Sequence, residues 1–66
     1  MPSWIIAIAA HTDDCVAVHI INAPTWQDAL NQSPAVWWHT PQDMELDDAM
    51  NLAREAYRCL INVKPL

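Results

Sequence analysis

The stretch from Ser3 to Asn22, SWIIAIAAHTDDCVAVHIIN, decides the fold because it holds two apolar runs on either side of a polar loop. Ser3–Ala10 lies between Pro2 and the polar residues 11–14, and its short length and β-branched content predict a strand. Cys15–Asn22 places valine or isoleucine at every second position, which predicts a second strand. A loop of four residues between two such runs is typical of a β-hairpin.

Both faces of the first strand are apolar. Side chains alternate across a strand, so Trp4, Ile6 and Ile8 share one face, and Ile5, Ala7 and Ala9 share the other. This pattern predicts a central strand or one that is covered on both sides.

A first helix is expected between Thr25 and Pro34. Thr25 is a good N-cap, Asp28 three residues later makes a pair resembling a capping box, and Pro34 stops the helix. Ala35–His39, AVWWH, is a short apolar piece and a candidate third strand.

A second helix is predicted to start with Thr40 as N-cap, Pro41 in the first helical position and Asp43 in the third. An apolar stripe at helical spacing follows, and the helix is expected to run to about residue 57. Residues 57–63 also alternate between apolar and polar, so a closing strand over these residues is the alternative.

The predicted fold class is α+β: one compact domain, residues 1–66, with a small antiparallel sheet (the hairpin plus one or two short strands) against two helices.

The charge is distributed unevenly along the chain. The formal net charge is −5, seven of the eight acids precede residue 54, and all three basic residues lie at 54 or later. Phosphate contacts require Lys and Arg, so direct binding to nucleic acid is disfavoured. The apolar run Trp4–Ala10 follows no basic residue and is too short for a membrane anchor, so neither membrane nor export is expected and the expected location is the cytosol.

Four carboxylates lie within six residues: Asp43, Glu45, Asp47 and Asp48. Acids in the opening turn of a helix offset its dipole, and this explains Asp43 and Glu45 better than it explains Asp47 and Asp48 in the second turn. Exposed carboxylates without neutralising bases attract basic protein surfaces. A partner-binding acidic surface is therefore expected here, with Asp13 and Asp14 as a second acidic contact.

Metal binding and catalysis are weaker hypotheses. The pattern HxDDCxxxH (residues 11–19) offers five candidate metal-ligand residues of three types, His, Asp and Cys, but it lacks the paired spacing of structural zinc sites. Cys15 with His19 or His39 offers a nucleophile and a base, yet a chain of 66 residues without glycine leaves little room for an oxyanion hole. We therefore expect no enzyme activity, no metal and no cofactor. Cys15 and Cys59 are expected to be buried thiols, with pairing left open.

The tryptophans at 37 and 38 are adjacent, so in an extended segment they point to opposite faces. One of the two is expected at the surface as an apolar anchor for a partner, since a tryptophan beside a charged rim is common at interfaces. The alternative is that Trp38 covers the sheet within its own chain.

The segment INAPTWQDALNQ (residues 21–32) leads from a strand through a threonine cap into a helix. This layout, together with the length and acidity, resembles small phage inhibitors of the anti-CRISPR type, and the likeness is architectural and best over residues 1–33. The resemblance implies an inhibitor that docks on a basic surface of a protein or ribonucleoprotein complex and occupies the path of DNA. A small self-associating structural domain, in which the apolar first strand and the tryptophan pair are buried in a homodimer, is the alternative.

Overall fold

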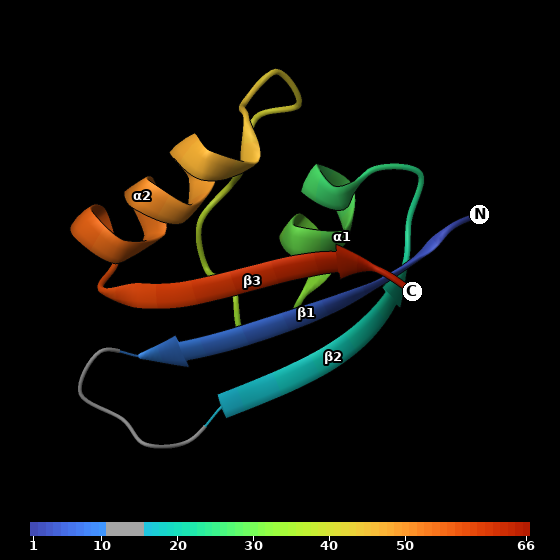
Figure 1. Cartoon of the computed structure of the whole chain (residues 1–66), viewed down its shortest axis with the longest axis horizontal. Coiled ribbons are helices and arrows are strands. Elements are labelled where there is room, and N and C mark those ends of the chain that lie inside the picture. Colours follow the sequence, from blue (N-terminus) through green and yellow to red (C-terminus); the bar gives the residue numbers. More distant parts are fainter. Residues whose placement is uncertain (11–15) are drawn as a thin grey trace.

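The computed structural model describes residues 1–10 and 16–66, and these form three strands and two helices (Figure 1). Along the chain they are β1 (Ser3–Ala10), β2 (Val16–Asn22), α1 (Trp26–Gln32), α2 (Leu46–Ala56) and β3 (Cys59–Pro65). The strands form one antiparallel sheet in the order β2-β1-β3, and both helices lie on the same side of it. The predicted α+β class with a small antiparallel sheet is confirmed.

The hairpin prediction is confirmed, and β1 is the central strand. Ile6 pairs with His19 of β2 on one side and with Val63 of β3 on the other. The end of the hairpin continues into α1 through Ala23, whose N–H donates to the Pro2 carbonyl at 3.1 Å and whose carbonyl accepts from the Trp4 indole at 3.0 Å. The loop predicted at residues 11–14, and Cys15 beside it, lie outside the described residues.

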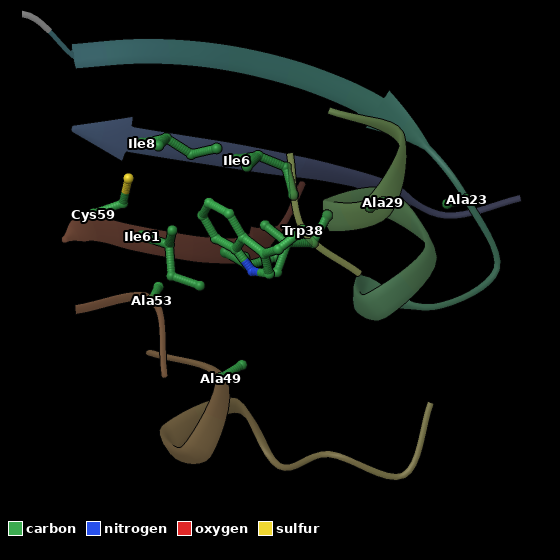
Figure 2. Packing of buried hydrophobic residues seen from close by; sticks show 11 residues of the cluster. Ile6, Ile8, Ala23, Ala29, Trp38, Ala49, Ala53, Cys59 and Ile61 are labelled. Carbon is green, nitrogen blue, oxygen red and sulfur yellow. The ribbon is translucent and has the colours of Figure 1, made fainter. Parts of the chain in front are cut away.

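The core lies between one face of the sheet and the helices. Ile6 and Ile8 of β1 point to this side, and the small Ala49 and Ala53 on the inner face of α2 let the helix approach the sheet closely (Figure 2). Because side chains alternate in β3 as well, its first three odd-numbered residues are buried on the same side. These are Cys59, Ile61 and Val63.

Two predictions about the second half of the chain need correction or completion. The candidate strand Ala35–His39 is not a strand: Val36 N donates to Ser33 O at 3.1 Å in a turn. The second edge of β1 pairs instead with β3. The closing strand that the sequence allowed as an alternative is therefore present. The second helix ends at Ala56 with Tyr57 as C-cap, as expected.

Arg58 carries the backbone from α2 into β3 in the left-handed conformation, with φ of 55°. It follows the C-cap residue Tyr57, a position that glycine usually occupies because a Cβ is unfavourable there. The chain has no glycine, so an arginine takes this conformation at an energetic cost.

Arg58→Gly should therefore raise the free energy of unfolding. The left-handed conformation costs an L-residue about 1–2 kcal/mol, and the extra freedom of glycine in the unfolded chain offsets about 0.5–1 kcal/mol of the gain. The expected increase is up to about 1.5 kcal/mol, measured as a higher urea midpoint with an unchanged slope. Arg58→Ala is the matched control, since it removes the same charge but keeps Cβ. A glycine variant no more stable than the alanine variant would contradict the explanation.

Candidate partner-binding surface

The segment that leads into α2 is held by two polar side chains of α1. Asn31 Nδ2 donates to the Thr40 carbonyl at 2.9 Å, and Asn31 Oδ1 accepts from the Thr40 N–H at 2.7 Å. Gln27, itself buried, donates from Nε2 to the Gln42 carbonyl at 3.0 Å and to the Met44 carbonyl at 3.3 Å. Side chains thus satisfy the Thr40 N–H and the carbonyls of Thr40, Gln42 and Met44, which is required where backbone is removed from water.

This arrangement corrects the predicted start of the second helix. Thr40 is only 1% exposed and its N–H is bonded to Asn31, so it is a packed residue and not a cap. Residues 41–44 form a turn, with Met44 N donating to Pro41 O at 3.3 Å. The N-cap is Glu45, whose side chain makes no capping hydrogen bond, and the helix begins at Leu46.

The later start exchanges the roles predicted for the acids. Asp47 and Asp48 occupy the first turn of α2, where carboxylates offset the helix dipole. Asp43 lies before the helix in the turn, and the carboxylate of Glu45 makes no cap hydrogen bond, so these two lack the helix-end role that the sequence suggested for them.

We call residues 43–48 the acidic segment. Its four carboxylate residues, Asp43, Glu45, Asp47 and Asp48, are all exposed. Arg54, one helix turn or more away, donates from Nη2 to Asn51 Oδ1 at 2.8 Å, so its guanidinium has a neutral partner on the same helix. The acidic segment therefore presents concentrated negative charge to solvent from a backbone that α1 restrains.

The N-cap of α1 was predicted correctly, and its acidic partner has a further contact. Thr25 Oγ1 accepts from Asp28 N at 3.1 Å. The Asp28 carboxylate accepts from Gln42 Nε2, and Gln42 Oε1 accepts from the Thr25 hydroxyl at 3.1 Å. The start of α1 is thus joined to the turn that carries Asp43.

The two adjacent tryptophans have different environments, as expected. Trp37 is 69% exposed, whereas Trp38 is 8% exposed and belongs to the core. Trp38 stacks on Tyr57 with ring centroids 4.6 Å apart and planes 7° apart, and Figure 2 shows it among the buried side chains on the helix side of the sheet. Trp38 must therefore be removed from the candidate partner contacts, and the alternative reading, that it covers its own sheet, is the one observed.

Trp37 lies beside Tyr57 and not beside the acids. Its ring meets Tyr57 edge-to-face at 4.7 Å and Trp38 edge-to-face at 5.5 Å. Tyr57 follows the C-terminal end of α2, and Asp47 is ten residues earlier, so the helix rise separates the two positions by about 15 Å. The exposed aromatic ring and the acidic segment thus mark opposite ends of α2.

The described residues give little structural support to the other predicted sites, which are the second acidic contact, the thiols and the metal site. Asp13 and Asp14, the second acidic contact, lie outside the described residues, as do His11 and Cys15. Cys59 is a buried free thiol whose Sγ donates to Tyr57 O at 3.3 Å. Within residues 1–10 and 16–66, no three His, Cys, Asp or Glu side chains come together as metal ligands. None of the helices in the described part of the chain has the length and apolar character needed to cross a membrane.

The chain matches no protein-family model, no curated protein and no solved structure.

The residues that sequence reasoning missed are Gln27 and Asn31. They lie four residues apart on one face of α1, but a polar pair at that spacing is usually a solvated helix face. Only the path of residues 40–44 alongside α1 shows that this polar face is an internal contact.

Asn31→Ala should lower the free energy of unfolding by about 1–3 kcal/mol, because it leaves the buried N–H and carbonyl of Thr40 without partners. Amide hydrogen exchange should accelerate at Thr40. Gln32→Ala is the control, since Gln32 is the exposed neighbour on the same helix and its replacement should have little effect. Equal effects of the two substitutions would contradict the role of Asn31.

Trp38→Ala should lower the free energy of unfolding by about 3–5 kcal/mol, the usual cost of truncating a buried aromatic side chain. A domain of this size has little stability to lose, so most molecules are expected to unfold. Trp37→Ala removes an exposed ring of the same size and is expected to cost less than about 1 kcal/mol. Chemical denaturation followed by circular dichroism measures both. Similar losses in the two variants would show that the assignment of core and surface is wrong.

Proposed function

We propose that this chain is a non-enzymatic, acidic protein-binding module of the phage inhibitor (anti-CRISPR-like) type, which works in the host cell cytosol. It blocks a basic, nucleic-acid-binding surface of a protein or ribonucleoprotein partner. The observation that carries the proposal is the acidic segment: four exposed carboxylates on a short stretch that α1 holds in place.

Two physical properties of the acidic segment support binding of a basic surface. Carboxylates accept charge-assisted hydrogen bonds from Arg and Lys, the same side chains that bind phosphate. The contacts of Gln27 and Asn31 restrain the backbone before binding, so less conformational entropy is lost when the partner docks. The module then competes with a nucleic acid for the same cations, in the manner of a DNA mimic.

Trp37 supplies the apolar part of the proposed contact. A large exposed ring that is held on two other rings is costly to leave in water and loses little freedom on binding. Because Trp37 packs on Tyr57, and the helix rise separates Tyr57 from Asp47 by about 15 Å, the partner would have to contact both ends of α2. The proposed footprint therefore extends along α2 and is not a single point.

The test uses a partner isolated from the native host by affinity capture on the immobilised chain. Replacing Asp43, Asp47 and Asp48 together with Asn should weaken binding to this partner by about tenfold or more. Binding of the wild-type chain should also weaken as salt rises from low to moderate concentration, since screening reduces attraction between exposed charges. Isothermal titration calorimetry measures both effects.

Glu55→Gln is the matched control, since Glu55 is an exposed acid on α2 outside the acidic segment. It should change the affinity by less than about twofold. The isolated partner should also lose its ability to bind nucleic acid when the chain is added to it. Affinity that is retained in the triple variant and insensitive to salt would rule out this mode of binding.

A further inference from the structure

The side of the sheet that faces away from the helices carries an ordered apolar surface. The strand register places three cross-strand rows there: Ile20–Ile5–Lys64, Val18–Ala7–Asn62 and Val16–Ala9–Leu60. We call these nine residues the open face. Val18 is 58% exposed and Ile20 is 64% exposed, and Val16 and Leu60 are also more than half exposed. Aliphatic side chains in this number at one surface indicate an interaction site more often than chance exposure.

The open face has a ridge and a hollow side by side. Val16, Val18 and Ile20 form the ridge along β2. The hollow lies over β1 and β3 and is lined by Ile5, Ala7, Asn62 and Lys64. Alanine at the middle of the central strand keeps this hollow low, while β-branched side chains raise the neighbouring strand. A ridge and a hollow on one surface are self-complementary, because a twofold axis places each ridge of a pair in the hollow of the other copy.

The charge distribution permits two copies to meet on this side. The open face contains one cation, Lys64, and no carboxylate. The acidic segment is in the helix layer on the other side of the sheet, so it is directed away from such a contact. The net charge of −5 still makes two copies repel at long range, and salt screens that repulsion.

The size of the open face sets the expected strength of the contact. Strands of seven or eight residues span about 25 Å, and three strands are about 14 Å wide, so the face measures roughly 350 Å². A face-to-face pair would bury on the order of 700–1,000 Å² in total, at the low end for specific interfaces. This area is enough for a reversible dimer and too small for a permanent one.

We propose that the open face binds a second copy of this chain, giving a face-to-face dimer of two sheets with the helices and the acidic segments outside. The dimer does not depend on the proposed function, and its response to salt is opposite. Added salt should strengthen self-association of the acidic chains, whereas it should weaken docking on a basic partner.

Sedimentation velocity from low to high micromolar protein concentration tests the proposal. The wild-type chain should show a monomer–dimer equilibrium in the micromolar range that shifts toward dimer at higher salt. Val18→Lys places a charge in the middle row of each copy and should raise the dissociation constant by about tenfold or more. Met50→Lys is the control, since Met50 is an exposed apolar residue of α2 in the other layer, and it should not weaken the dimer.

Ile20→Thr is a second variant on the ridge that keeps a β-branched side chain, and circular dichroism verifies that each variant is folded. A weaker dimer in this variant as well supports the proposal. A wild-type chain that stays monomeric at all concentrations would overturn it. A dimer that Val18→Lys leaves unchanged would also overturn it and would point to edge pairing of β2 or to association through α2.

Discussion

Pairing of β1 with both of its neighbours is the constraint on which the rest of this structure depends. Because β1 is central and antiparallel to β2 and β3, the directions of Ile6 and Ile8 decide which face of all three strands is the core. A shift of the register by one residue would turn every side chain of the shifted strand to the other face. The helices cover the face of Ile6 and Ile8, and the apolar residues on the other face are left open to solvent.

The second organising contact is polar. Gln27 and Asn31 use side-chain amides to replace the backbone partners that residues 40–44 would have in a regular element. This contact lets a segment without helix or strand lie against α1, and it delays the start of α2 to Leu46. The exposed position of the acids follows from it, because the buried side of the segment is occupied by Thr40 and by the amide contacts.

The resulting molecule separates two kinds of surface on opposite sides of the sheet. The helix layer carries the acidic segment and the exposed Trp37, which suit a basic partner. The open face carries aliphatic side chains and a single cation, which suit a second copy. Since the two surfaces do not overlap, a dimer would display two acidic segments at once. Two linked copies bind a repeated or elongated target more tightly than one copy does.

Periodicity and capping signals were enough to predict the hairpin, the N-cap at Thr25 and the end of the second helix, since these depend on residues close together in the sequence. The predicted start of the second helix was wrong. Thr40 and Pro41 form a strong local start signal, but hydrogen bonds from a distant side chain, Asn31, override it. Local patterns likewise could not choose between Trp37 and Trp38, or between the two apolar faces of β1. Contacts with residues far away in the sequence decide both questions. Tyr57 stacks on Trp38, and the helices pack on one side of the sheet and leave the other side open.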